Sequence, residues 1–258
     1  MGKPPPQQFY RLQPFLDFFA EGTPVLMYHK IGTRPRRVRL KGLYVLPSVF
    51  ERQLAEFAAA GFVSATPSEA RDAGHQSSPR RVALTFDDGF RNVFENAMAP
   101  LARHRMSAIQ FLVANLIGKD NEWEEREGES TEPLMDAAQV REWLAAGHSI
   151  GSHSLSHPRL TRLTARDARE EIFTSKKKLE DMFGIPITHF CYPYGEFNPA
   201  VRDLVMEAGY ESACTVQYGV NTPNTPAFEL NRITVRHPTR TLRTLTNALT
   251  ESVAELTN

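Results

Sequence analysis

The sequence contains only two cysteines, Cys191 and Cys214, among 258 residues. Two cysteines cannot build the disulfide framework that stabilises many small secreted domains. An excess of charge of one sign is also missing, because 30 Lys and Arg residues balance 30 Asp and Glu residues. These shortages exclude a disulfide-rich scaffold, and the balanced charge gives no reason to expect a nucleic-acid partner.

Long apolar runs are missing as well. No stretch reaches the roughly 20 apolar residues that a membrane-spanning helix needs, so no transmembrane segment is expected. The opening MGKPPPQQFYRLQPFLDFFAEG lacks the uninterrupted apolar core of a signal peptide, because Asp17 interrupts its best stretch. The sequence therefore predicts a cytoplasmic protein.

Hydrophobic residues make up 41% of the chain and charged residues 23%, a balance typical of globular proteins with a sizeable core. After a Pro-rich N-terminal arm (residues 1–23), short apolar runs alternate with patterns of helical periodicity from residue 24 to residue 258. This alternation of about seven strand–helix units predicts an α/β fold in a single domain, with a parallel sheet closed into a (β/α)7-type barrel. The predicted strands are 24–29, 81–86, 107–114, 148–153, 187–193, 211–216 and 230–235, and the predicted helices are 47–62, 92–105, 135–147, 164–184, 198–210 and 241–258.

An acidic stretch, KDNEWEEREGESTEP (residues 119–133), interrupts the alternation. It has neither helical nor strand periodicity and is predicted to be an inserted surface loop. Trp123 in this stretch is a candidate sugar-stacking side chain, whereas Trp143 lies on an amphipathic helical pattern and is expected in the core. His148 and His189 begin predicted strands, far from the barrel rim where chemistry is expected, so structural roles are favoured for both.

Two adjacent aspartates, Asp87 and Asp88, end the predicted strand in RVALTFDDGF (residues 81–90). In (β/α) barrels this end of the strands carries the chemistry. One aspartate could bind a cation while the other accepts a proton, and the cation would offset their mutual repulsion. Taken alone, DDG fits a simple Asp-Gly turn better.

A pair of histidines four residues apart, His153 and His157, follows the next-but-one predicted strand in GSHSLSH (residues 151–157). On a helical turn this spacing places both imidazoles on one face, although a solvated or capping pair is the commoner meaning of such a spacing alone. The pair should open onto the same rim as Asp88. One carboxylate and two histidines form a three-ligand site for Zn²⁺ or another divalent first-row metal, with a position left open for water.

These segments resemble a known family. TFDDG (85–89), HSLSH (153–157) and YPYG (192–195) follow the order and spacing of motifs in the polysaccharide deacetylases, carbohydrate esterase family 4. Members remove N-acetyl, sometimes O-acetyl, groups from sugars on a distorted (β/α) barrel. The resemblance extends over about residues 24–237. It implies that Asp87 is the general base, that Asp88, His153 and His157 are metal ligands, and that the Tyr194 backbone N–H helps to bind the oxyanion.

The sequence departs from this family where the third motif usually begins with an arginine that orients the catalytic aspartate. Cys191 occupies that position and cannot supply a guanidinium. Arg232, in the predicted strand 230–235, is the best replacement. A surface or loop-bridging role for Arg232 is equally compatible with the sequence.

A second departure concerns the general acid, which in the family is usually a histidine on the last strand. His237 is the one histidine after residue 230, in a context that matches poorly. His29 ends the first predicted strand, which lies beside the last strand in a closed barrel. The start of the chain resembles the exopolysaccharide deacetylases with a circularly permuted barrel, in which an early histidine is the acid. His29 is therefore favoured over His237.

These observations predict a metal-dependent enzyme that hydrolyses the N-acetyl group of an N-acetylated sugar or glycan intermediate and releases acetate. The expected partner is thus an N-acetylated saccharide, and the oligomeric state stays open. One alternative is a related hydrolase of another C–N bond, such as that of a cyclic amide or imide. Another is a catalytically impaired carbohydrate-binding barrel, suggested by the missing arginine at Cys191.

Overall fold

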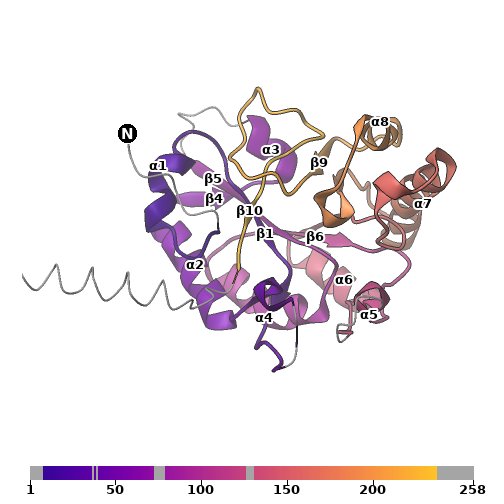
Figure 1. Cartoon of the computed structure of the whole chain (residues 1–258). Helices are drawn as coiled ribbons and strands as arrows, with labels where there is room; N and C mark the ends of the chain where they lie inside the picture. The colour runs from indigo at the N-terminus through magenta and orange to yellow at the C-terminus, as the bar shows by residue number, and fades with distance from the viewer. Residues whose placement is uncertain (1–7, 37, 39, 73–78, 126–130, 237–258) are drawn as a thin grey trace, which may run out of the picture.

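The central sheet is parallel throughout and curls around an axis, with its helices on the outside (Figure 1). In the computed structural model, which describes residues 8–36, 38, 40–72, 79–125 and 131–236, the strand order is β10-β1-β5-β6-β7-β8-β9. A further strand, β4 (Phe62–Ser64), pairs with the start of β5. The strands in this order are β10 (Ile233–Thr234), β1 (Val25–Tyr28), β5 (Arg80–Phe86), β6 (Ile109–Leu112), β7 (Ser149–Ser152), β8 (His189–Cys191) and β9 (Ser212–Cys214).

The two ends of the sheet lie next to each other. Leu26 in β1 is paired with Ile233 in β10, and a single parallel bridge joins Cys214 at the end of β9 to Leu230, just before β10. The segment leading into β10 therefore contacts both β9 and β1. This arrangement confirms the predicted distorted (β/α) barrel in one domain and the predicted neighbourhood of the first and last strands.

Five longer helices cover the outer face of the sheet (Figure 1). Local signals set their starts: Asp136 forms a capping box with Gln139, and the Thr164 hydroxyl accepts a hydrogen bond from the Asp167 backbone N–H at 3.2 Å. Within the described ranges no helix is both long and apolar enough to cross a membrane. The helix predicted over 241–258 lies outside the described residues. The five helices are α2 (Pro47–Ala59), α4 (Arg91–Arg103), α6 (Ala137–Ala145), α7 (Ala165–Phe183) and α8 (Pro199–Glu207).

Short elements that the sequence pattern did not reveal connect these units. A second, two-stranded parallel sheet pairs β2 (Lys30–Ile31) with β3 (Tyr44–Val45) directly after β1. The described residues also include three α-helical segments of four to six residues, α1 (Leu16–Phe19), α3 (Pro67–Asp72) and α5 (Glu122–Glu125), and four 3-10 helices of three residues each. Elements this short have too few residues to show a period.

The barrel strands are buried because helices cover one face and the opposite face lines the barrel interior. All four residues of β1 are buried, as are all four of β6, which matches the continuous apolar runs expected of parallel strands. Trp143 on α6 is fully buried, as predicted, and its indole N–H donates a hydrogen bond to the Ser149 carbonyl at 2.8 Å. Its ring meets Phe86 edge to face, with centroids 6.1 Å apart.

The described part of the predicted N-terminal arm, residues 8–23, packs against the barrel. Phe9 donates a backbone hydrogen bond to Thr234 at 2.9 Å and forms a bridge with Val235. Its ring is fully buried against Phe15 and Phe57. This segment therefore extends the hydrophobic core beside the strand that closes the barrel.

Two histidines are buried in the barrel wall, away from the rim. The ring of His148, just before β7, lies 4.3 Å from the ring of Trp143, and burial lowers its pKa to about 4. Burial also lowers the pKa of His189, at the start of β8, to about 4, although Glu69 acts in the opposite direction. Both rings are therefore neutral in the folded protein at neutral pH.

We expect acid to destabilise the fold through these two rings. In the unfolded chain a histidine takes up a proton near pH 6.5, whereas His148 and His189 resist protonation until about pH 4, so stability is lost as the pH falls through this window. The loss should be on the order of 2 kcal/mol for each ring. Urea unfolding of the wild-type protein and of His148→Phe between pH 7 and pH 4.5 measures it. Identical pH slopes for the two proteins would contradict the assignment to His148.

Candidate active site

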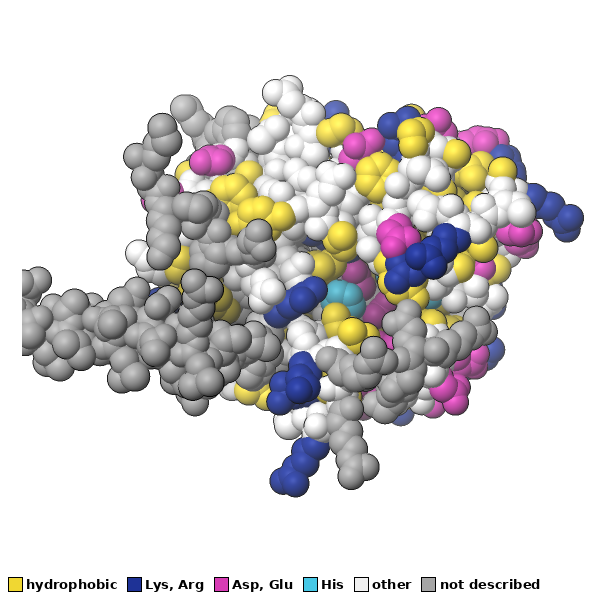
Figure 2. Space-filling view, in the orientation of Figure 1, with side chains coloured by type: hydrophobic (Ala, Val, Ile, Leu, Met, Phe, Trp, Pro, Cys, Tyr) yellow, Lys and Arg dark blue, Asp and Glu magenta, His cyan; other side chains and the backbone are white. Residues whose placement is uncertain are grey.

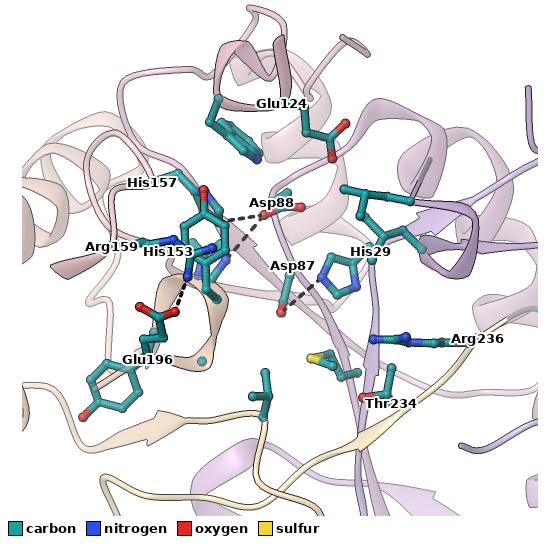
Figure 3. Close-up of a pocket in the computed structure, with 18 residues that line it drawn as sticks. His29, Asp87, Asp88, Glu124, His153, His157, Arg159, Glu196, Thr234 and Arg236 are labelled. Carbon is teal, nitrogen blue, oxygen red and sulfur yellow. Dashed lines mark hydrogen bonds and ion pairs between the residues drawn. The ribbon is translucent and has the colours of Figure 1, made fainter. Parts of the chain in front are cut away.

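The carboxyl ends of the barrel strands surround a pocket of about 550 Å³ (Figure 3). His29 follows β1, Asp87 and Asp88 follow β5, and His153 and His157 follow β7. All five side chains line the pocket. The structure thus brings together, at one end of the barrel, residues that lie more than a hundred positions apart in the chain.

Asp88, His153 and His157 present three ligand atoms within 4.8 Å of one another. The Nε2 atoms of both histidines lie 3.4 Å from Asp88 Oδ1. A tetrahedral cation with bonds of about 2.0–2.1 Å holds its ligand atoms about 3.3–3.4 Å apart. The two distances from Asp88 therefore match the spacing of a tetrahedrally coordinated divalent cation, and the two histidine ligand atoms lie within 4.8 Å of each other.

Neighbouring groups orient these ligands and set their protonation. Burial lowers the pKa of His153, but Cys191 and Asp88 outweigh it and raise this pKa well above its usual value, so a cation would have to displace a proton from that ring. The carbonyl of Cys191 lies 2.8 Å from Nδ1 of His153, so it can accept that N–H and leave Nε2 free to coordinate. Burial lowers the pKa of His157 to about 3, against the charge of Asp88, so the ring is neutral at pH 7. Burial raises the pKa of Asp88, but the His153 hydrogen bond and the nearby histidines outweigh it and keep the carboxylate ionised.

The spacing of the two histidines predicted a helical turn, but the structure shows that they do not lie on one. Residues 153–157 form an irregular loop in which Ser154 and His157 have left-handed backbones, with φ of 67° and 62°. The Ser154 hydroxyl accepts a hydrogen bond from the His157 backbone N–H at 3.0 Å and closes the loop. Two left-handed residues therefore turn the chain so that both rings face the pocket, and helical periodicity plays no part.

Backbone strain is concentrated at this site. Of five non-glycine residues with positive φ among the described residues, four lie here: Asp88, Ser154, His157 and Tyr194. Such conformations cost free energy and persist where the surroundings impose them, which is typical of functional sites. The adjacent Gly89 has φ of 83°, and a Cβ there would come within 2.9 Å of a Leu112 methyl group. Close packing beside the aspartate pair thus requires this glycine.

Arg232 holds Asp87, the first aspartate of the pair. Its Nη1 and Nη2 donate hydrogen bonds to the two oxygens of Asp87 at 2.7 and 2.8 Å, and both side chains are almost fully buried. Further hydrogen bonds to the Thr215 carbonyl, at 2.7 Å, and the Thr85 hydroxyl, at 3.2 Å, orient the guanidinium. Burial raises the pKa of Asp87, but Arg232 outweighs burial and holds this pKa below its usual value. Arg232 thus reaches Asp87 from the strand segment expected to replace the arginine missing at Cys191.

A second group of possible ligands, Asp87, His153 and Cys191, overlaps the first. It suits a cation poorly, since the positive Arg232 guanidinium contacts both oxygens of Asp87 and lies 3.1 Å from Cys191 Sγ. Burial also raises the pKa of the Cys191 thiol to about 11, so it stays protonated at neutral pH. The Asp88 group is therefore the better candidate.

His29 lies on the other side of Asp87, with its Nε2 3.9 Å from Asp87 Oδ2 (Figure 3). Its side chain is 17% exposed and reaches the pocket from the end of β1. Burial lowers the pKa of His29, while the charge of Asp87 raises it. His237, the competing candidate for this position, lies outside the described residues.

Aromatic rings form one wall of the pocket. Trp123 stacks on His157 with centroids 4.5 Å apart, and the Tyr194 ring lies 4.7 Å from the same imidazole. Tyr194 has φ of 60° in the short turn Pro193–Gly195 after β8. The Arg159 guanidinium lies 3.9 Å from the Tyr194 ring centroid and forms an ion pair with Glu196. Trp123 therefore faces the pocket, where the sequence had made it a sugar-stacking candidate.

Sequence reasoning missed a buried ion pair next to His29. Lys30 is only 2% exposed, and its Nζ donates hydrogen bonds to both oxygens of Glu124 at 3.0 and 3.3 Å. It also lies 3.5 Å from an oxygen of Glu132 and 4.4 Å from the Phe90 ring centroid. Residues 119–133 thus include the helix α5 and turn Glu124 inward, unlike the surface loop predicted. The one feature of the sequence that could have indicated this ion pair is the position of Lys30 inside an apolar run.

A comparison with known families decides the assignment of the chain. The family model described as polysaccharide deacetylase matches residues 74–213, more than half of the sequence. The chain belongs to the polysaccharide deacetylase family. The matched residues include Asp87, Asp88 and both histidines of the candidate metal site. His29 and Arg232 lie outside them, in the chain segments that flank the match.

Individual relatives are distant. YxkH of Bacillus subtilis (strain 168) is 27% identical over 215 residues, which are 82% of this chain and 71% of YxkH. The peptidoglycan-N-acetylglucosamine deacetylase PgdA of Listeria monocytogenes is 26% identical over 194 residues, covering 73% of this chain but only 36% of PgdA. The poly-β-1,6-N-acetyl-D-glucosamine N-deacetylase of Staphylococcus aureus is 24% identical over 159 residues, which are 60% of this chain and 54% of that protein.

Solved structures share the fold. BC0361, a polysaccharide deacetylase from Bacillus cereus, has a TM-score of 0.72 at 25% identity and covers 88% of this chain and 68% of its own. IcaB from Ammonifex degensii has a TM-score of 0.71 at 24% identity, over 84% of this chain and 93% of its own. The barrel of this deacetylase family member is thus found in proteins with little sequence identity to it.

We expect Lys30→Met to destabilise the protein by about 3–5 kcal/mol, because it leaves the buried Glu124 carboxylate without its cation. Urea unfolding at pH 7 measures the change, and adding Glu124→Gln to Lys30→Met should restore part of it. The control is Lys177→Met, which removes an exposed ion pair with Asp181 and should cost less than about 1 kcal/mol. Equal effects of the two lysine substitutions would show that burial adds nothing to the Lys30 contact.

Proposed function

We propose that this polysaccharide deacetylase family member hydrolyses the N-acetyl group of an N-acetylated saccharide, in a reaction that depends on a divalent cation. The observation that carries the proposal is the juxtaposition of two differently held aspartates. Asp87 is bound by Arg232 on both oxygens, while Asp88 shares a cation-sized space with His153 and His157. Asp87 thus lies beside the candidate metal site without being one of its three ligands.

Asp88, His153 and His157 would hold the cation, with Zn²⁺ as the first choice because their donor set and spacing match its tetrahedral preference. A cation there lowers the pKa of a water molecule that it binds to about 7 and polarises a carbonyl oxygen. Other first-row divalent cations accept the same ligands.

Asp87 would accept the proton of the attacking water. Its pKa below the usual value keeps it ionised at neutral pH, and Arg232 fixes the plane of the carboxylate. Since both oxygens already accept hydrogen bonds from Arg232, the lone pairs that remain point away from the guanidinium. A general base positioned in this way contributes typically about 10²–10⁴-fold to the rate.

Tyr194 and His29 would act on the acetyl carbonyl and on the leaving amine. The backbone N–H of Tyr194, in the strained turn after β8, is the proposed donor to the oxyanion of the tetrahedral intermediate. His29 would protonate the leaving nitrogen. Burial lowers the pKa of His29, and the charge of Asp87, 3.9 Å away, only partly offsets this, so the imidazole would have to take up a proton during the reaction before it could act as the acid.

The substrate proposed is an N-acetylglucosamine-containing saccharide. Two of the relatives carry names of N-acetylglucosamine deacetylases, PgdA and the Staphylococcus aureus enzyme. The pocket volume of about 550 Å³ is within the range of small-ligand sites, and both Trp123 and Tyr194 line it. Because Arg159 covers the Tyr194 ring, Trp123 is the proposed stacking surface for a sugar. The contact of Arg232 with Asp87 supports an active barrel over a catalytically impaired one, because Arg232 supplies a guanidinium that Cys191 cannot.

We expect Asp87→Asn and Asp88→Asn to abolish deacetylation in different ways. Asp87→Asn should reduce kcat by about 10²–10⁴-fold with zinc content unchanged, because it removes the proton acceptor but none of the three ligands. It also leaves Arg232 without its counter-charge, so urea unfolding of this variant is measured alongside. Asp88→Asn should lose the cation itself, as one of three ligands is weakened. Acetate release from a chitooligosaccharide and zinc content by atomic absorption distinguish the two. An Asp87→Asn protein with normal turnover would overturn the proposed base.

The same assay, with zinc added to protein first treated with a chelator, tests the rest of the proposal. Chelated protein should release no acetate, and zinc should restore the release. His29→Ala should lower kcat with zinc content intact. Full activity of His29→Ala would exclude it as the acid, and activity of the chelated protein would exclude the cation.

We expect Arg232→Met to shift the acid limb of the pH–rate profile to higher pH. Without the guanidinium, burial raises the pKa of Asp87, so the base becomes protonated, and inactive, at a pH where the wild-type protein still works. Arg232→Lys keeps a charge but not the two-pronged contact and should shift the limb less. Kcat/KM measured from pH 4.5 to pH 9 tests this. A lower rate with an unshifted limb would mean that Arg232 acts on stability alone.

A further inference from the structure

Charge is matched almost everywhere in the wall of the pocket. Each carboxylate that lines it has a basic or histidine partner among the described residues, and most of these contacts are buried. The matched groups are Asp87 with Arg232, Asp88 with His153 and His157, Glu124 with Lys30, and Glu196 with Arg159.

Arg236 is the one charged residue lining the pocket that has no oppositely charged partner among the described residues. Arg236, two residues beyond β10, is exposed and lines the pocket. Figure 3 shows its guanidinium directed into the pocket, near Thr234 and His29. Within the part of the chain that the structure describes, no hydrogen bond or ion pair involves Arg236.

The position of Arg236 is constrained by its neighbour Gly42. A Cβ at residue 42 would lie 3.0 Å from Cδ of Arg236, so the aliphatic part of the arginine crosses bare backbone there. Lys41, next to this contact, is also exposed. Figure 2 shows a histidine at the bottom of a hollow that basic side chains border. Arg236 and Lys41 thus place two exposed basic residues on the same side of the pocket.

We propose that Arg236 forms an anion subsite, so that the substrate is an N-acetylated saccharide that carries a carboxylate or phosphate group. This inference rests on the proposed deacetylase function and narrows its substrate. An unpaired guanidinium beside a partly enclosed site binds planar or tetrahedral oxyanions through two parallel hydrogen bonds. A neutral sugar would leave this charge uncompensated, whereas an acidic sugar would complete the matching of charge in the pocket.

The test compares three N-acetylated probes in the zinc-loaded protein: a neutral chitooligosaccharide, an oligosaccharide alternating N-acetylglucosamine with a uronic acid, and uridine diphosphate N-acetylglucosamine. We expect one anionic probe to have the highest kcat/KM, and the two anionic probes distinguish a carboxylate from a phosphate. Arg236→Gln should lower the ratio of anionic to neutral kcat/KM by about 10- to 100-fold, the effect of one lost charge-assisted contact. Arg236→Lys should lower it less. Arg166→Gln, an exposed arginine on α7 outside the pocket, is the charge-matched control and should leave all rates unchanged.

Binding of the same probes to zinc-free protein, measured by calorimetry, keeps the inference separate from the proposed reaction. Tighter binding of an anionic probe that is weakened by salt and lost in Arg236→Gln supports the subsite even if no acetate is released. That result, without acetate release, would support the anion subsite and contradict the proposed deacetylase function. Equal affinity for the neutral and anionic probes, or an unchanged preference in Arg236→Gln, would overturn the subsite. Acetate release in the same protein would still support the deacetylase function.

Discussion

The ion pair between Arg232 and Asp87 is the contact on which the organisation of the site depends. Its guanidinium arrives from the segment that bridges β9 and β1, and its carboxylate ends β5. A buried pair of this kind is costly to break, because either partner alone would be an uncompensated charge in the core. The same contact therefore joins the closing segment of the barrel to the aspartate beside the candidate metal site, and it fixes the direction in which Asp87 presents its free lone pairs.

The contact also shows how a family site can be built from different parts of the chain. The residues matched by the family model supply both aspartates and both histidines, while His29 and Arg232 come from the segments before and after the match. In a closed parallel barrel these two flanking segments lie side by side, as the pairing of Leu26 with Ile233 demonstrates. Side chains from the two flanking segments can therefore reach the same end of the barrel although they lie far apart in the sequence.

Features determined locally could be predicted from the sequence. The barrel, its longer helices and the caps at Asp136 and Thr164 follow from periodicity and short-range hydrogen bonds. Arg232 could be proposed because strand ends converge. The helical turn at residues 153–157 was wrong, since left-handed residues such as Ser154 and His157 carry no sequence signature unless they are glycine. The contact of Lys30 with Glu124 was missed because it joins two very short elements, β2 and α5, that lie far apart in the chain.

The position of Arg232 late in the sequence affects when the site becomes complete during synthesis of the chain. The three candidate cation ligands are complete once His157 has emerged, whereas the guanidinium that orients Asp87 is among the last described residues to leave the ribosome. Because the Cys191 carbonyl that contacts His153 and the guanidinium that holds Asp87 both come from later strands, the geometry of the site is complete only when β8 and the segment leading into β10 are in place.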